Sequence, residues 1–223
     1  MTSETLTSYL KLLACDGIGV MTARKLLEIS KDVTKLFAAD NLNFFSEFNI
    51  AKSIQDIILK FDRHKLIEDE LEFIKRNEIK CVGILCDDYP TLLKECIDAP
   101  ILLFYKGDLT LLNNKCLAIV GTRKVTSYGK ETTVKLMEYL KSYKITIVSG
   151  MAYGIDIAVY HEARKCKLAT VGVMGTSFKK LYPATHKNYY NDLFENGLVV
   201  TEYAGFNTLV PELFTRRNRI IAG

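Results

Sequence analysis

Three turns in the second half of the sequence combine a glycine at the end of an apolar run with residues that suit anion binding. In IVGTRKVTSYGK, Gly121 follows such a run and precedes Thr122 and Arg123. A glycine at the carboxyl end of a strand lets backbone amides approach an anion, and a guanidinium group matches phosphate oxygens. The dinucleotide-binding pattern GxGxxG is absent here. Alternatively, Gly121 only makes the turn and Arg123 lies in solvent.

The second turn lies in IVSGMAYGIDIAVYHEA, where the apolar run ends in Ser149 and Gly150. The small connection through Met151 and Ala152 leaves room for a ligand close to the main chain. Asp156 falls in the first turn of the helix that follows. We expect it to interact with the helix dipole or to orient neighbouring groups, rather than to act as a general base.

The third turn contains Gly175 and opens a segment in which basic residues alternate with tyrosines. The basic residues are Lys179, Lys180, His186 and Lys187, and the tyrosines are Tyr182, Tyr189 and Tyr190. Single-stranded nucleic acid needs cations for its phosphates and flat faces for its unpaired bases. The pattern favours such a ligand, although ordinary surface charge with tyrosines partly in the core explains it equally well.

Two further segments carry residues that suit DNA. LFTRRNRIIAG places Arg216, Arg217 and Arg219 close together, and because a helix cannot direct all three the same way, we expect two to face a ligand. Near the N-terminus, Gly17 and Gly19 join two helical segments in a pattern that resembles a helix-hairpin-helix. The amides of such a turn can bind a DNA phosphate, or the hairpin can serve only for packing.

The composition limits the class of protein. Hydrophobic residues make up 48% and charged residues 25% of the 223 residues, which is the balance of a globular protein. A net charge of +4 is too small to indicate a polyanionic partner by itself. Six cysteines without a CxxC pair, and only three histidines, indicate reduced thiols and neither a metal site nor a cofactor. No apolar run reaches the roughly 18 residues that span a bilayer, and signal-peptide features are absent, so we expect a cytoplasmic protein with no membrane partner.

The periodicity of apolar residues predicts two domains. Residues 1–75 read as a small all-helical domain of the helix-hairpin-helix or SAM-like kind. Residues 76–223 alternate short Val/Ile/Leu-rich runs with amphipathic stretches, which predicts an α/β domain with a Rossmann-like, mostly parallel sheet. From residue 116 onward only four such runs remain, where these folds have about five or six strands. We therefore expect a domain that is truncated at its C-terminal end.

In an open α/β sheet, ligands bind outside the carboxyl ends of the strands. All three turns should therefore open onto one edge and form an anion-binding cleft. The residues expected to bind nucleic acid there are Gly121, Thr122, Arg123, Ser149, Gly150, Met151, Ala152, Gly175, Lys187, Arg217 and Arg219.

Six segments, taken together and in order, resemble the DprA (Smf) family of bacterial DNA-processing proteins. They are DDYPTLLKECIDAPILLFYKGD, IVGTRKVTSYG, SGMAYGIDIAVYHEA, GTSFKKLYPATHKN, NGLVVTEY and FTRRNRIIAG, and they span residues 87–223. The resemblance implies an extended Rossmann fold that forms a homodimer, binds and protects single-stranded DNA, and loads the recombinase RecA during natural transformation. It assigns the family's GxR motif to Gly121 and Arg123, its basic position to Lys187, and its RNR motif to residues 217–219.

Two rival functions remain. Phosphoribohydrolases share a Rossmann-like sheet and a phosphate cleft, but they need a PGGxGTxxE-type loop with a catalytic carboxylate, which this sequence lacks. A nucleotide-sensing module would also fit an anion-binding cleft. We expect a DNA-binding protein without catalytic residues.

Overall fold

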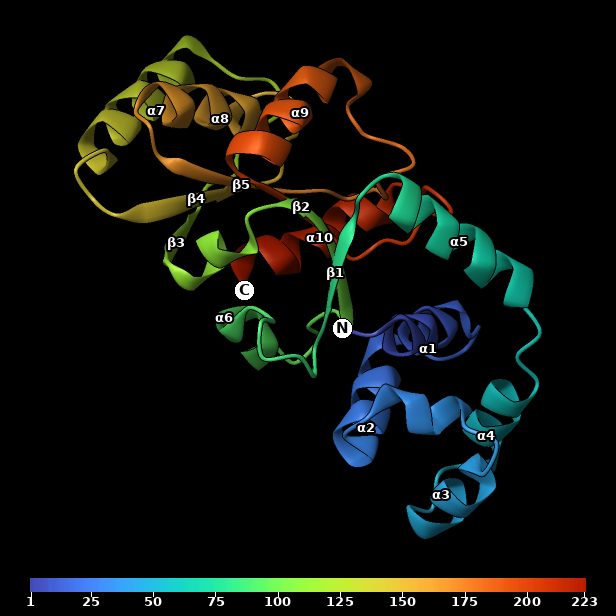
Figure 1. Cartoon of the computed structure of the whole chain (residues 1–223). Coiled ribbons are helices and arrows are strands. Elements are labelled where there is room, and N and C mark those ends of the chain that lie inside the picture. The colour runs from blue at the N-terminus through green and yellow to red at the C-terminus, as the bar shows by residue number, and fades with distance from the viewer. The chain divides into compact units, whose positions relative to one another are not determined.

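The computed structural model describes all 223 residues, and the chain divides into two compact units. Unit 1 comprises Met1–Tyr89 and Lys94–Leu103, and unit 2 comprises Pro90–Leu93 and Phe104–Gly223 (Figure 1). The helical part of the sequence ends at Arg76 and the first strand begins at Lys80. The domain boundary near residue 75 stays a prediction.

Unit 1 is mainly helical. Its helices are α1 (Ser3–Ala14), α2 (Val20–Ser30), the 3-10 helix η1 (Val33–Phe37), α3 (Asn41–Glu47), α4 (Lys52–Leu59) and α5 (His64–Arg76). The hydroxyl of Thr2 accepts the N–H of Thr5 at 3.1 Å and caps the start of α1. Leu10, Leu12 and Leu27 are buried at 0–1% exposure, so the apolar residues that repeat every three to four positions do form the core of this unit.

The remaining elements lead into and through unit 2. They are β1 (Lys80–Gly83), α6 (Thr91–Glu95), β2 (Leu102–Gly107), η2 (Leu109–Asn113), β3 (Lys115–Ala118), α7 (Ser127–Leu140), β4 (Ile145–Ser149), α8 (Ile155–Lys165), β5 (Ala169–Val173), η3 (Ala184–His186), α9 (Lys187–Asn196), β6 (Leu198–Thr201) and α10 (Glu212–Ala222).

The strands form one mixed sheet in the order β1-β2-β6-β5-β4-β3. Strands β3, β4, β5 and β6 are parallel to one another, and β2 pairs with β6 in the antiparallel direction. The predicted α/β fold with a mostly parallel sheet is confirmed. Because β3, β4 and β5 run the same way, their carboxyl ends lie at the same edge, which we call the carboxyl edge.

Helices of unit 2 cover both faces of its sheet. In Figure 1, α7, α8 and α9 lie on one face and α10 lies on the other. Met137 from α7 and Val159 from α8 pack with Ile147 of β4, and all three are fully buried. A second cluster joins Tyr190 of α9 with Val199 of β6. Dense packing on this face fixes the starts of α8 and α9, which lie at the carboxyl edge. No helix of the chain has the length and apolar character needed to cross a bilayer.

Candidate nucleic-acid interface

The structure joins the first two predicted turns through one carboxylate. Asp156 is 3% exposed, and its Oδ1 accepts the N–H of Gly121 at 3.2 Å while its Oδ2 accepts the N–H of Ala152 at 3.3 Å. Burial raises the pKa of Asp156 above its ordinary value, and these N–H donors, together with the charge of Arg217, oppose that rise. As expected, Asp156 orients its neighbours. However, it also occupies the N–H groups of Gly121 and Ala152, two residues that the sequence predicts to bind nucleic acid.

Main-chain packing locks the same two turns together. The N–H of Ile155 donates to the carbonyl of Thr122 at 3.0 Å. Gly154 has φ of 87°, and a Cβ at this position would lie 2.1 Å from the Thr122 oxygen. Only glycine fits there, because other residues meet both an unfavourable φ and a steric clash. Arg123 therefore extends from a turn whose backbone is held in place.

Arg217 of α10 connects the second turn with the end of β5. Its side chain is buried at 5% exposure, and its Nη1 donates to the carbonyl of Gly150 at 2.6 Å and also to the carbonyl of Val173. A Cβ at Gly150 would lie 2.4 Å from Nη2 of Arg217, so the glycine makes room for the guanidinium group. Burial lowers the pKa of Arg217 and the Asp156 carboxylate opposes this. The expectation that Arg217 faces a ligand is therefore corrected: this side chain holds the carboxyl edge together from within.

The other two arginines of α10 also differ from expectation. Arg219 forms an ion pair with Glu202, and both side chains are largely buried, at 16% and 13% exposure. Arg216 is the exposed arginine of the three. The structure thus places Arg216 in solvent and directs Arg217 and Arg219, the predicted pair, into the protein. The reason is that the apolar residues Leu213, Ile220 and Ile221 determine which face of α10 packs against the sheet.

The third segment joins the second through His186 and Tyr153. His186 is buried, and its Nδ1 lies 3.0 Å from the carbonyl oxygen of Met151. The hydroxyl of Tyr153 lies 3.1 Å from that of Thr185, and the ring of Tyr153 contacts that of His186 at 5.0 Å. Lys187 follows His186 directly and is exposed. An unbroken series of contacts therefore connects the turn that carries Arg123 with the helix that begins at Lys187.

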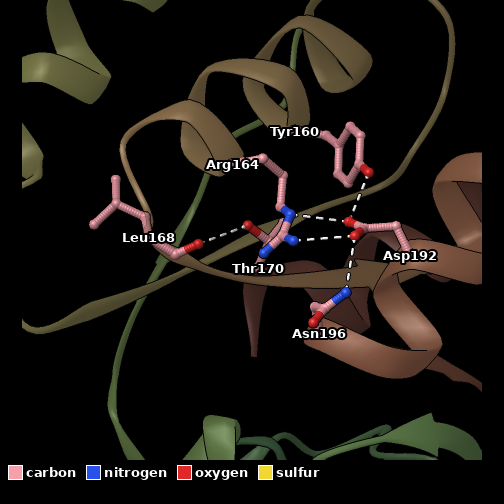
Figure 2. Close-up of polar contacts among 6 residues, drawn as sticks. All are labelled: Tyr160, Arg164, Leu168, Thr170, Asp192 and Asn196. Atoms are coloured by element: carbon pink, nitrogen blue, oxygen red, sulfur yellow. Dashed lines mark hydrogen bonds and ion pairs between the residues drawn. The ribbon is translucent and has the colours of Figure 1, made fainter.

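Figure 2 shows the polar network that fixes α9 against α8. Arg164 and Asp192 form an ion pair, with Nε to Oδ2 at 2.9 Å and Nη2 to Oδ1 at 3.0 Å. Tyr160 donates to Oδ2 at 2.8 Å, and Asn196 donates to Oδ1 at 3.0 Å. Burial acts to raise the pKa of Asp192, but these hydrogen bonds and the charge of Arg164 hold it below its ordinary value. The network orients the helix that starts at Lys187.

Aromatic side chains lie beside these basic residues. Tyr153 and Tyr182 are 43% and 41% exposed, and the ring of Tyr182 packs on that of Phe214 at 5.1 Å. Tyr190 is fully buried, and its hydroxyl donates to the carbonyl of Tyr182 at 2.7 Å. The sequence did not single out Tyr153, although an exposed aromatic residue inside a turn that approaches a ligand is a signal of base stacking.

The profile of the family described as DNA recombination-mediator protein A matches residues 80–223, which is more than half of the chain. The chain belongs to this family. Among individual relatives, it is 39% identical to the DNA processing protein DprA of Streptococcus pneumoniae over 141 residues, covering 63% of this chain and 50% of that protein. It is 29% identical to Protein Smf of Borreliella burgdorferi over 206 residues, covering 88% of this chain and 66% of that protein.

Two solved structures of the family are similar to this one. The X-ray structure of DprA from Streptococcus pneumoniae has a TM-score of 0.80 and 29% identity, and the match covers 96% of this chain and 74% of that chain. A structure of DprA from Helicobacter pylori has a TM-score of 0.57 and 28% identity, and the match covers 65% and 64% of the two chains. The chain spans about half the length of several of its family relatives.

Within this family member, the predicted site residues fall into two groups. Thr122, Arg123 and Lys187 are exposed and Ala152 is half-buried. Ser149, Gly150, Met151 and Gly175 are buried together with Arg217. The first group can meet a ligand through side chains, whereas the second shapes the carboxyl edge from inside.

The structure also contains the predicted helical hairpin of unit 1. The segment between α1 and α2 includes Gly17, whose φ is 90°, and Gly19, which precedes the first residue of α2. Both glycines are exposed. A DNA contact at this turn stays a prediction. The chain contains no group of His, Cys, Asp and Glu side chains placed to hold a metal ion, and all six cysteines are free.

Proposed function

We propose that this chain binds single-stranded DNA at the carboxyl edge of unit 2, without making or breaking a covalent bond. The observation that carries the proposal is the series of contacts that fixes Arg123 and Lys187, both exposed, along one edge. Fixed cations beside exposed rings suit a flexible phosphodiester strand. Arg123 and Lys187 neutralise phosphates, and Tyr153 offers its ring to an unpaired base.

Membership of the recombination-mediator family supports this proposal, as does the Helicobacter pylori relative, whose structure is described as showing a single-stranded DNA binding mode. The chemistry of Asp156 argues against the phosphoribohydrolase alternative. Its carboxylate is buried and accepts two main-chain hydrogen bonds, so it is not placed as a free general base.

The test compares the wild type with Arg123→Ala and Lys187→Ala in titrations of a labelled oligothymidylate of about ten nucleotides at several salt concentrations. Each variant should bind more weakly for every sequence and should reduce the slope of log affinity against log salt by about one unit. Lys144→Ala is the matched control, because Lys144 is exposed but precedes β4 at the opposite edge. Unchanged affinity and slope in both variants would refute the assignment.

The family further suggests the role of the bound DNA. We propose that the whole protein protects incoming single strands and loads RecA onto them, acting as a homodimer. A nuclease-protection assay with the same two variants tests protection, and RecA strand-exchange on coated DNA tests loading. Sedimentation at several concentrations tests the dimer. Arg123→Ala should reduce both the nuclease protection and the RecA strand exchange in proportion to its loss of affinity for DNA.

A further inference from the structure

The sheet of unit 2 ends at β3, and one side of this strand has no neighbouring strand. β3 is last in the strand order and pairs only with β4. All of its residues, Lys115–Ala118, are exposed. The N–H of Ile119, just past the strand, donates to the carbonyl of Val148 in β4. Because successive residues of a strand direct their main-chain groups to opposite sides, those of Cys116 and Ala118 point to the open side and can pair with another chain.

The helix α7 turns one of its sides toward this open edge. Met137 is fully buried against the sheet. Glu138 accepts the thiol of Cys166 at 3.5 Å, so its side of the helix faces α8, which lies beside α7 (Figure 1). Successive residues of a helix are about 100° apart. Leu136 therefore lies on the other side of Met137 from Glu138, above the open edge of β3, and it is 36% exposed.

Further uncharged residues extend this side of α7 into an exposed stripe. They follow one another three or four residues apart, which places them on one face of the helix, and they are Tyr128, Thr132, Leu136 and Tyr139. The ring of Tyr139 packs on that of Tyr143 with 5.5 Å between centroids. Leu117 of β3 lies on the same face of the sheet as Ile119, which packs beneath α7, and it is 38% exposed. An apolar surface therefore borders the edge.

The beginning of the open edge is positively charged. Lys115 is the first residue of β3 and Lys144 directly precedes β4, so both lie where these parallel strands begin. Both lysines are exposed, and neither forms an ion pair within the chain. The carboxylates of α7 do not compensate this charge, because each is paired with a lysine of the same region. A ligand with carboxylates complements this end of the edge.

We propose that the open edge of β3 binds an extended acidic segment of a partner protein, which adds a strand to the sheet. The main chain of the segment pairs with Cys116 and Ala118, its apolar side chains pack on the stripe of α7, and its carboxylates contact Lys115 and Lys144. A polypeptide fits better than a nucleic acid, because only a polypeptide repeats N–H and C=O groups in the same alternation. A second copy is disfavoured, since its own β3 edge carries the same lysines. The inference does not rest on the proposed DNA binding.

The test uses the full chain and a synthetic peptide of roughly ten residues, the upper length of common strands. The peptide alternates valine with threonine and carries glutamates at both ends, and a matched peptide carries lysines there. The wild type should bind the acidic peptide more tightly than the basic one. Bound acidic peptide should slow the hydrogen exchange of the N–H groups of Cys116 and Ala118, because these groups then donate to the peptide.

Three variants address the three parts of the site. Cys116→Pro removes an N–H that points away from β4, so it should keep the melting temperature but weaken binding about tenfold. Leu136→Glu should weaken binding about tenfold as well, whereas its control Val134→Glu, at an exposed position on the α8 side of the same helix, should not. Lys115→Glu should shift the preference toward the basic peptide, and its control Lys167→Glu, before β5, should not.

The outcomes separate this inference from its alternatives and from the proposed function. Slowed exchange at Cys116 and Ala118, with weaker binding in Cys116→Pro and Leu136→Glu and unchanged controls, supports the added strand. Absence of peptide binding, or wild-type affinity in both variants, overturns it. Sedimentation that shows a dimer of the wild type but a monomer of Cys116→Pro also overturns it, because a second copy then occupies the edge. All variants should bind oligothymidylate like the wild type, so loss of DNA binding in the wild type refutes only the proposed function.

Discussion

The three turns at the carboxyl edge share a sequence pattern, an apolar run that ends in a glycine. They differ in whether their main-chain N–H groups have hydrogen-bond acceptors within the chain. After β3 and β4, the N–H groups of Gly121 and Ala152 are bound by the carboxylate of Asp156. After β5, the N–H groups of residues 175–178 donate to nothing within the chain. A strand-end glycine therefore does not by itself make an anion site. The N–H groups of such a turn are available to an anion only where no carboxylate of the chain itself accepts their hydrogen bonds.

The largest expected effect comes from removing that anion. Asp156→Ala leaves buried N–H groups and the buried Arg217 guanidinium without their carboxylate, so we expect a loss of about 3 kcal/mol in the free energy of unfolding. The variant should also make the first two turns resemble the third. Added inorganic phosphate should then raise the melting temperature of Asp156→Ala more than that of the wild type, as measured by calorimetry.

Equal responses of the two proteins to phosphate would contradict this account of the first two turns. Asp156→Asn is the companion variant, since it keeps the size of the side chain and one acceptor oxygen. It should lose less stability than Asp156→Ala and respond less to phosphate.

A smaller effect concerns the exposed ring of the second turn. Tyr153→Ala removes a stacking surface that is 43% exposed, so the affinity for oligothymidylate should fall by about tenfold. The melting temperature should change little, because the hydroxyl contact with Thr185 lies at the surface. Tyr143→Ala is the control, since Tyr143 is 50% exposed and precedes β4 at the opposite edge. A similar loss in both variants would remove Tyr153 from the interface.

The smallest expected effect is a pH dependence. Burial raises the pKa of Asp156 in the folded chain, so the folded state holds this proton more tightly than the unfolded chain does. The resulting stabilisation is complete below the ordinary pKa of about 3.9 and is lost as the pH rises through the raised value. Urea unfolding at a series of pH values should show the stability of the wild type relative to Asp156→Asn decreasing across that window. A relative stability that increases with pH across the same window would contradict a raised pKa of Asp156 in the folded chain.

Much of the fold was predictable from the sequence. Uninterrupted Val/Ile/Leu runs predicted the parallel strands, and the amphipathic stretches 127–142 and 153–165 correspond to α7 (Ser127–Leu140) and α8 (Ile155–Lys165). Both signals are local, because a strand buried on two faces and a helix buried on one each need a characteristic order of apolar residues. The order of the family's motifs added the identity of the fold.

The state of individual site residues was less predictable. Arg217 has the residue type of a phosphate ligand, but its direction depends on which face of α10 packs against the sheet. Likewise, the turn at Gly121 was expected to bind an anion, and the sequence could not show that Asp156, 35 residues further on, accepts the Gly121 N–H in the folded structure. Spacing in sequence identifies the turns, whereas tertiary contacts decide which donors remain free.

The most direct test of this comparison follows the main-chain amides themselves. In an NMR titration of the isotope-labelled chain with oligothymidylate, the amide resonances of residues 175–178 should shift strongly, together with that of Lys187. The resonances of Gly121 and Ala152 should shift little, since their N–H groups stay bound to Asp156. Strong shifts at Gly121 and Ala152 with none at residues 175–178 would contradict the account.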